Sequence, residues 1–186
     1  SFIPEQTTIW SFPERGKWAT HSGRYRGNWS PYVPRNLILR YSKPEDWILD
    51  QFLGSGTTLV EAKLLNRNAI GVDINPQSIS LSEANLNFEC ETQSKIFVRN
   101  GDATELSFIK DNKIDFICTH PPYANIIKYS SNIIGDISLL DEQEFFDAIN
   151  KVARESYRVL KKGKCCAIMI GDKRLRGNVV PLGFQL

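Results

Sequence analysis

The chain has 186 residues, which suits a single domain with a full hydrophobic core. Its hydrophobic fraction of 41% and charged fraction of 24% are ordinary for a soluble globular protein. No apolar run is long enough to span a membrane, and the N-terminal segment lacks the pattern of a signal peptide, so we expect no membrane partner. A net charge of +2 indicates no particular class of partner.

The cysteine pattern argues against a metal site and against a disulfide framework. Cys90, Cys118, Cys165 and Cys166 form no Cys-x-x-Cys pair and stand in apolar contexts. We therefore predict no metal ligands, and a reducing cytoplasm is the expected location.

Basic residues gather in two segments of the chain. Those of the first are Arg15, Lys17, Arg24, Arg26, Arg35 and Arg40, and those of the second are Lys161, Lys162, Lys164, Lys173, Arg174 and Arg176. Clusters of this kind either bind phosphate groups or form a solvated face, and the sequence leaves both readings open.

Residues 1–33 are rich in Trp, Gly, Pro and Arg without periodicity, and we interpret them as a loop-rich N-terminal arm. Residues 34–186 form the expected catalytic domain. It begins with a helix opened by Pro34 that runs through Leu37 and Leu39. The chain stops just after a strand-like run, which is consistent with a piece of a longer protein.

From residue 47 onward the pattern alternates between strands and helices. The expected strands are 47–50, 69–73, 96–99, 114–119 and a buried strand 164–170, and the expected helices are 57–65, 76–88 and 141–162. In the last helix, Asp141 and Glu144 resemble a helix cap, Phe145, Ile149, Val152 and Ser156 share one face, and Gly163 is the expected stop. Such alternation predicts an α/β fold with a mostly parallel sheet and helices on both faces.

The residues that follow each strand carry the functional signal, because ligands of parallel sheets bind at the carboxyl ends of the strands. After the first strand, residues 50–58 read Asp-Gln-Phe-Leu-Gly-Ser-Gly-Thr-Thr. Its glycines permit a tight turn, and the following helix start offers unpaired N–H groups. It is not a phosphate-binding P-loop, because no Gly-Lys-Ser/Thr follows. A simple strand-to-helix turn remains the alternative reading.

Acidic residues follow the next two strands. Asp73 lies about twenty residues beyond the glycine turn, which suits a ribose diol, although it also suits the N-cap of the next helix. Asp102, in Gly-Asp-Ala, either accepts a hydrogen bond from an adenine amino group or belongs to a turn.

The fourth strand is followed by Thr119-His120-Pro121-Pro122-Tyr123. Two successive prolines end the strand and fix an extended turn, so their carbonyl groups point in fixed directions. The tyrosine ring offers a stacking surface.

These segments resemble motifs of the DNA amino-methyltransferases, which make N6-methyladenine or N4-methylcytosine. Residues 50–58 are similar to the cofactor motif Asp-Pro-Phe-x-Gly-Ser-Gly-Thr-Thr of that family, and residues 119–123 are similar to its catalytic motif Asp/Asn/Ser-Pro-Pro-Tyr. Residues 29–34 resemble the segment that helps to hold the methionine part of the cofactor. The resemblance runs from about Trp10 to Asp172.

The resemblance implies S-adenosyl-L-methionine as cofactor, DNA as partner and a Rossmann-like methyltransferase fold for residues 34–186. The implied cofactor-binding residues are Ser30, Pro31, Asp50, Phe52, Gly54, Ser55, Gly56, Asp73, Ile74, Asp102, Ala103 and Thr119. The implied catalytic residues are His120, Pro121, Pro122 and Tyr123. His120 and the Pro121 carbonyl would hold the target amino group, and Tyr123 would stack on a base flipped out of the duplex.

Three departures from the family pattern matter. Gln51 stands where the family usually has proline, and His120 stands where Asp, Asn or Ser is usual, which leaves cytosine or adenine open with a slight preference for cytosine. The family's sheet ends in an antiparallel hairpin, and we expect its strands to be lacking here. A further region of a longer chain, a partner subunit or a dimer mate is then expected to cover the sheet edge.

Two other functions remain alternatives at this stage. One is an RNA or protein-glutamine methyltransferase, whose Pro-Pro-Tyr chemistry is similar. The other is a non-catalytic subunit that keeps the fold and binds nucleic acid.

Overall fold

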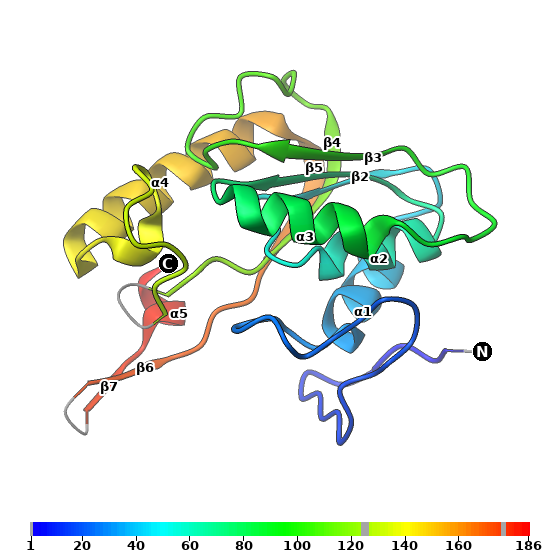
Figure 1. Cartoon of the computed structure of the whole chain (residues 1–186), viewed down its shortest axis with the longest axis horizontal. Coiled ribbons are helices and arrows are strands. Elements are labelled where there is room, and N and C mark those ends of the chain that lie inside the picture. Colours follow the sequence, from blue (N-terminus) through cyan, green and yellow to red (C-terminus); the bar gives the residue numbers. More distant parts are fainter. Residues whose placement is uncertain (1, 124–126, 176–177) are drawn as a thin grey trace.

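A computed structural model of the protein describes residues 2–123, 127–175 and 178–186 (Figure 1). Five parallel strands form one sheet in the order β3-β2-β1-β4-β5. The strands are β1 (Trp47–Asp50), β2 (Asn68–Asp73), β3 (Ile96–Asn100), β4 (Ile114–Thr119) and β5 (Leu160–Ile168). The predicted α/β fold with a mostly parallel sheet is confirmed.

The strand order reverses beside β1. The chain first moves outward from β1 to β2 and β3, and then returns to place β4 on the other side of β1. At such a switch point the connections leave the sheet in opposite directions, which opens a crevice outside the carboxyl ends of the strands. The topology therefore places the expected ligand site at the ends of β1, β2 and β4.

Helices cover both faces of the sheet, as the alternating pattern predicted (Figure 1). They are α1 (Tyr32–Tyr41), α2 (Thr57–Leu64), α3 (Pro76–Leu86) and α4 (Glu142–Val159). Successive side chains of β1 point to opposite faces. Ile48 packs in a cluster with Ile38 of α1 and Leu59 of α2, whereas Leu49 packs in a second cluster with Val159 of α4.

Helix α1 begins two residues earlier than predicted, at Tyr32, so Pro34 is its third residue. Proline is tolerated throughout the first turn, because the N–H groups of that turn have no partner within the helix. Pro31 adopts helical angles at the N-cap and accepts the Arg35 N–H through its carbonyl oxygen at 3.1 Å. The predicted start at Pro34 was two residues late, because proline is accepted at any position of the first turn.

Helix α4 begins as predicted and ends earlier. Asp141 accepts the Glu144 N–H at 2.9 Å, and Glu144 reciprocates in a capping box. The predicted face is present, since Phe145, Val152 and Ser156 are buried. The helix ends at Val159, and β5 follows at once from Leu160.

Gly163 was therefore wrongly predicted as a helix stop. It lies inside β5 with φ +78°, where the pairing with β4 shifts register between Ile114 and Phe116. A glycine with positive φ serves a bulge as well as a helix end, so its presence alone does not distinguish the two.

Strand β5 is the edge strand of the sheet, and the prediction of a buried strand there was wrong. Cys165, Cys166 and Ile168 are exposed on it. The main sheet contains no antiparallel strand among residues 2–123, 127–175 and 178–186. A separate antiparallel pair, β6 (Lys173–Leu175) and β7 (Asn178–Val180), follows, and the sequence analysis did not predict it. A short 3-10 helix η1 (Ile137–Leu139) and α5 (Leu182–Gln185) were also not predicted.

The predicted N-terminal arm has no helix or strand from residue 2 to residue 31 and packs along α1 and α2 (Figure 1). None of the helices in the described part of the chain combines the length and the apolar character needed to cross a bilayer.

Candidate active site

A pocket opens at the carboxyl ends of β1, β2 and β4. It contains most of the residues that the sequence analysis selected after the strands: Asp50, Phe52, Gly54, Ser55, Asp73, Ile74, Asp102, Ala103, His120 and Pro122. Four further lining residues come from the arm, namely Tyr25, Gly27, Asn28 and Trp29. The pocket thus joins three separate strand ends to a segment far away in sequence.

The glycine turn after β1 takes the conformation that its residues predict. Gly54 has φ +52° and Gly56 has φ +86°, which are left-handed values that a side chain disfavours. Gly56 is the N-cap of α2, and a Cβ atom there would lie 3.1 Å from the Cβ of Ser82. No side chain caps this helix start, so its N–H groups remain available near the turn.

Asp73 fastens the glycine turn to the turn after β2. Its Oδ2 accepts the Gly54 N–H at 2.8 Å, and its Oδ1 accepts the Asn75 N–H at 2.9 Å. Burial raises the pKa of Asp73, and the two backbone N–H groups partly oppose that shift. The alternative N-cap role is excluded, because Asn75 caps α3 by accepting the Gln77 N–H.

Asp50 and Thr119 connect the ends of β1 and β4. The Thr119 hydroxyl donates to Asp50 Oδ1 at 2.8 Å and accepts the Gln51 N–H at 3.2 Å. Burial raises the pKa of Asp50 to about 6, against the opposing bonds from Thr119 and the Phe52 N–H. Thr119 itself is buried and does not line the pocket, so it acts on the site through Asp50.

Asp102 reaches the pocket from the loop between β3 and β4. Its Oδ1 accepts the Thr104 N–H at 2.8 Å, which is a turn contact. Its Oδ2 lies toward Gly135, where a Cβ atom would come within 3.1 Å of that oxygen. Asp102 therefore belongs to a turn and also presents its second oxygen to the pocket.

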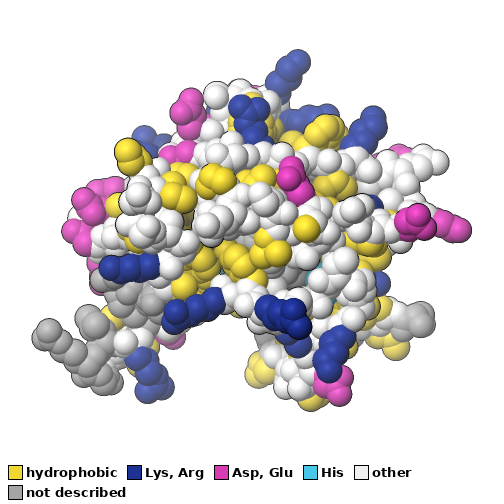
Figure 2. Space-filling view, in the orientation of Figure 1, with side chains coloured by type: hydrophobic (Ala, Val, Ile, Leu, Met, Phe, Trp, Pro, Cys, Tyr) yellow, Lys and Arg dark blue, Asp and Glu magenta, His cyan; other side chains and the backbone are white. Residues whose placement is uncertain are grey.

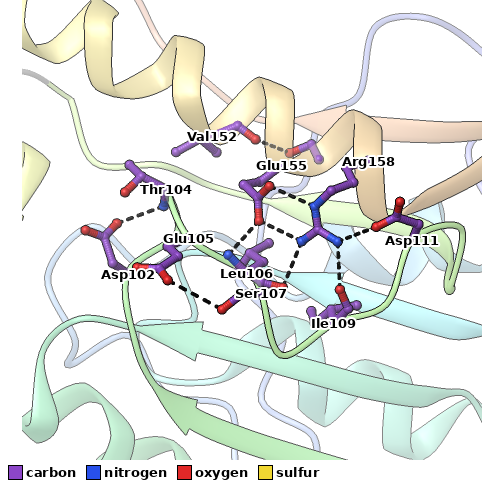
Figure 3. Close-up of polar contacts among 11 residues, drawn as sticks. Asp102, Thr104, Glu105, Leu106, Ser107, Ile109, Asp111, Val152, Glu155 and Arg158 are labelled. Carbon is purple, nitrogen blue, oxygen red and sulfur yellow. Dashed lines mark hydrogen bonds and ion pairs between the residues drawn. The ribbon is translucent and has the colours of Figure 1, made fainter.

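The loop that carries Asp102 is tied to α4 by Arg158 and Glu155 (Figure 3). The Arg158 guanidinium donates to the carbonyl oxygens of Leu106 and Ile109 at 2.9 and 2.8 Å. Glu155 accepts the Leu106 N–H at 2.7 Å and two guanidinium N–H groups. We call residues 101–109 with these contacts the loop wall of the pocket.

The opposite side of the pocket is formed by the arm. Asn28 Oδ1 accepts the Thr57 hydroxyl at 2.6 Å, which fixes the arm to the start of α2. The Tyr25 hydroxyl contacts Ser78 Oγ at 3.1 Å, and its ring stacks on Tyr129 with centroids 6.1 Å apart. We call residues 25–29 the arm wall.

The part of the arm that precedes this wall is anchored by Glu61 of α2, whose side chain is 0% exposed. Trp18 Nε1 and His21 Nε2 both donate to Glu61 Oε1 at 2.6 Å, and Arg35 Nη1 donates to Oε2 at 2.7 Å. Glu61 and the arm residues 25–28 were not predicted from the sequence, whereas Asp102 and Ala103 of the loop wall were expected to bind the cofactor. A Glu in the apolar pattern of α2 was the available signal, since a buried carboxylate requires partners.

His120 lines the pocket beside the arm wall. Its ring stacks on Trp29 with centroids 5.5 Å apart and an interplanar angle of 28°. Burial lowers the pKa of His120 to about 4, because desolvation disfavours the charged ring. The imidazole is therefore neutral near pH 7 and retains one acceptor nitrogen.

Tyr123 does not line the pocket. Its hydroxyl lies 3.1 Å from His120 Nε2 and accepts the Gly171 N–H at 2.8 Å, so the ring is docked beyond the end of β5. Pro121 is buried and also absent from the lining, whereas Pro122 contributes to it.

Two further predicted residues lie behind the arm wall. The Ser30 hydroxyl donates to the Arg15 carbonyl at 2.9 Å, and Pro31 is the buried N-cap of α1. Neither lines the pocket, nor does Gly56, so these residues shape the walls rather than the cavity.

The sequence analysis missed the segment between Tyr129 and Ile137, which closes the pocket. Tyr129, Gly135, Asp136 and Ile137 line it, and Asp136 caps η1 by accepting the Ser138 N–H at 2.9 Å. Residues 124–126, just before this segment, lie outside the described residues.

Several basic residues of the two clusters are engaged within the chain. Arg15 donates to the carbonyl oxygens of Asn28 and Trp29, and Arg35 pairs with Glu61. Lys161 and Lys164 pair with Asp115 at the start of β4, away from the pocket. Arg24, Arg26 and Arg174 are exposed, whereas Arg176 and the Lys173 side chain lie outside the described part. Figure 2 shows Lys and Arg side chains beside a hollow between the arm and the hairpin β6–β7.

Residues 4–84 match the family model N6_N4_Mtase, described as DNA methylase. The chain is 40% identical over 76 residues to the Type II methyltransferase M2.DpnII of Streptococcus pneumoniae, covering 41% of this chain and 27% of that protein. Over residues 4–84 this chain is therefore similar to the N6/N4 DNA methylases. The resemblance found in the sequence is confirmed.

A second similar protein is named for a different substrate. It is 33% identical over 125 residues to the tRNA (guanine(10)-N2)-dimethyltransferase of Methanothermobacter thermautotrophicus, covering 67% of this chain and 35% of that protein. The chain thus spans about a third or less of the length of these relatives.

The fold of the chain is that of S-adenosylmethionine-dependent methyltransferases. TrmN from Thermus thermophilus aligns with a TM-score of 0.59 and 20% identity, over 77% of this chain and 39% of that one. An S-adenosylmethionine-dependent methyltransferase from Methanococcus maripaludis aligns with a TM-score of 0.51 and 22% identity, over 74% and 53%. The predicted Rossmann-like fold is confirmed.

Proposed function

We propose that the protein transfers a methyl group from S-adenosylmethionine to the exocyclic amino group of cytosine (N4) or adenine (N6) in DNA. The observation that carries this proposal is the convergence in one pocket of Gly54, Asp73 and Asp102 with His120. The first three are suited to an adenosyl cofactor, and the last follows β4 in a turn like that of the amino-methyltransferases.

The chemistry of the lining residues fits S-adenosylmethionine. Asp73 would bind the ribose hydroxyls and Asp102 the adenine amino group, while Ile74 and Phe52 supply apolar contact. The cofactor supplies an electrophilic methyl group when bound.

Activation of the amine falls to His120 and the Pro121 carbonyl. The lone pair of an exocyclic amine is delocalised into the base, which makes the nitrogen a weak nucleophile. Two hydrogen bonds donated by the amine to these acceptors would draw the nitrogen out of the ring plane and free the lone pair. With the cofactor bound, these acceptors would hold the nitrogen in line with the methyl group, and the proton released from the methylated nitrogen would pass to water. Proximity would contribute much of the rate.

No covalent enzyme intermediate is needed for this reaction. Cys118 lies within β4 and is 0% exposed, and burial raises the pKa of its thiol well above the usual value. A protonated thiol is a poor nucleophile, so direct transfer is the mechanism that these residues favour.

An amino group inside duplex DNA is paired, so the base has to be flipped into the pocket. Stacking on Tyr123 would offset this cost by about 1–3 kcal/mol. Arg24 precedes the arm wall and Arg26 belongs to it, and these two exposed residues are the ones best situated to bind phosphate groups.

RNA is the second candidate substrate, favoured by the similarity to a protein named as a tRNA (guanine(10)-N2)-dimethyltransferase. Guanine N2 is also an exocyclic amine, so the same acceptors would serve it. The Gly-Ser-Gly-Thr-Thr turn and the DNA methylase match favour DNA.

Product analysis separates these candidates. The protein is incubated with labelled S-adenosylmethionine and either duplex DNA or tRNA, and the nucleosides are identified by mass. We expect N4-methylcytosine or N6-methyladenine from DNA. Methylguanine from tRNA alone would replace the DNA proposal, and cofactor binding without any methylated nucleoside would contradict both.

A further inference from the structure

The hydroxyl of Tyr123 makes a contact that base stacking does not require. It lies 3.1 Å from His120 Nε2 and 2.8 Å from the Gly171 nitrogen. We propose that Tyr123 is a positioning residue: its hydroxyl donates to His120 Nε2, holds that nitrogen as an acceptor, and occupies the place that the target amine later takes. This inference rests on the proposed function.

The direction of the hydrogen bond follows from counting protons. The Gly171 N–H is a donor without acceptor capacity, so the Tyr123 oxygen accepts that bond. The single hydroxyl proton is then available for His120 Nε2. If Nε2 accepts a hydrogen bond from this hydroxyl, the ring proton of the neutral imidazole must be on Nδ1.

The surroundings favour the neutral ring that this arrangement needs. Stacking against Trp29 and burial exclude water from one face of His120, and burial lowers its pKa to about 4. A hydrogen bond donated to the neutral ring acts in the same direction, because protonation would remove the acceptor. Near pH 7 the ring therefore presents Nε2 as an acceptor.

Gly171 provides the docking point for Tyr123. A Cβ atom at Gly171 would lie 3.2 Å from the Tyr123 hydroxyl and 3.4 Å from its ring. The tyrosine thus rests against backbone at the end of β5 instead of inside the pocket. To stack on a flipped base it has to leave Gly171, and its departure vacates Nε2 for the amine.

The exchange has a chemical consequence. The acceptor that the amine requires is already selected before substrate binds, so no tautomer change precedes transfer. One donor, the phenol, is replaced by another, the amine, and the number of hydrogen bonds to Nε2 is unchanged. Tyr123 would then contribute in two ways, through its hydroxyl before binding and through its ring afterwards.

Nitrogen NMR of the imidazole rings tests this arrangement without turnover. The chain has two histidines, His21 and His120, and a His120→Asn variant assigns the signals. In the 15N-labelled protein without ligand we expect an unprotonated Nε2 and a protonated Nδ1 for His120 between pH 6 and 8. Tyr123→Phe should lose this clear preference and should raise the His120 pKa toward the usual value of ~6.5.

Tyr25→Phe is the matched control, because it removes a pocket hydroxyl that contacts Ser78 instead of His120. It should leave both the tautomer and the pKa of His120 unchanged. An Nε2–H tautomer in the parent protein, or identical His120 spectra in the parent and in Tyr123→Phe, would overturn the inference.

Addition of duplex DNA and S-adenosylhomocysteine tests the exchange itself. We expect the Gly171 amide signal to shift as it does in Tyr123→Phe, while His120 Nε2 stays an acceptor. If the protein methylates DNA but the Gly171 signal does not move, the exchange is wrong. If neither DNA nor RNA is methylated while the tautomer is as described, the proposed function fails and the positioning contact stands.

Discussion

The arm wall and the loop wall reach the same pocket from opposite faces of the sheet, and they are anchored differently. Glu61, which holds the arm, is 0% exposed and accepts three side-chain donors. Arg158, which holds the loop, is 29% exposed and binds mainly backbone carbonyl groups and Glu155. Removing one partner of a buried ion pair costs far more stability than removing one partner of a pair that water can solvate.

This difference suggests how the two walls respond to change. The arm has no helix or strand of its own, so its conformation depends on side-chain contacts to α2. The loop wall connects β3 to β4 along the chain, and two of its residues, Leu106 and Ile109, are buried in the hydrophobic core. We therefore expect the arm to depend on a few side-chain contacts, three of which are made by Glu61, and the loop wall to depend on many packing contacts.

The largest effect is expected for Glu61→Ala. Removal of a fully buried carboxylate leaves Arg35 and His21 without their partner, and the free energy of unfolding should fall by about 3–5 kcal/mol. Urea denaturation measures it, with Glu83→Ala on the exposed face of α3 as control. A loss no greater than the ~1 kcal/mol of a surface ion pair would remove the distinction between the walls.

Asp73→Ala comes next, because Asp73 joins the turn near the arm wall to the turn after β2. The affinity for S-adenosylmethionine should fall at least about tenfold, equivalent to ~1.4 kcal/mol, as expected for a charge-assisted hydrogen bond. Calorimetry on the folded variant is the measurement. Unchanged affinity would show that the ribose is held elsewhere.

The contact of His120 with the arm wall predicts a pH effect on stability. Its folded pKa of about 4 lies below the unfolded value of ~6.5, so the unfolded chain binds more protons between these values. Stability therefore falls as pH decreases through this window, by at most about 1.4 kcal/mol per pH unit. Asp50, with a folded pKa raised to about 6, acts in the opposite sense.

Replacing the histidine isolates its share of this effect. His120→Asn should lose less stability than the parent between pH 6.5 and pH 4.5, as measured by denaturation at both values. Equal losses in the two proteins would mean that His120 protonates as readily in the folded chain as in the unfolded chain.

The smallest effect is expected for Arg158→Ala in the loop wall. Arg158 and Glu155 are partly exposed and Asp111 is exposed, so water replaces part of the lost bonding, and we expect a loss of about 1 kcal/mol and a weaker cofactor affinity. Arg154→Ala, exposed on the same helix, is the control. A loss as large as that of Glu61→Ala would contradict the proposed contrast between the walls.

The sequence predicted the part of the site that depends on strand ends. Parallel strands bring their carboxyl ends to one edge, so Gly54, Asp73 and Asp102 could be placed together from the order of elements alone. The exclusion of Asp73 as a helix cap needed the structure, because Asp73 and Asn75 are both residues that cap helices.

The arm wall could not be predicted in this way. Trp29 and Tyr25 come from a segment without periodicity, whose path is set by contacts with residues more than forty positions away, such as that between Tyr25 and Ser78. The docked position of Tyr123 depends on a backbone N–H at Gly171, which carries no side-chain signal. The course of β5 was missed because a glycine with positive φ suits both a helix stop and a bulge.

The central claim is that His120 and the Pro121 carbonyl hold the target amine, and single-turnover methyl transfer tests it most directly. Parent, His120→Ala and His120→Asn are compared at saturating cofactor and DNA. We predict that alanine loses most of the rate while keeping cofactor affinity, and that asparagine retains more, because its carbonyl oxygen restores an acceptor. An alanine variant as fast as the parent would contradict the role given to His120.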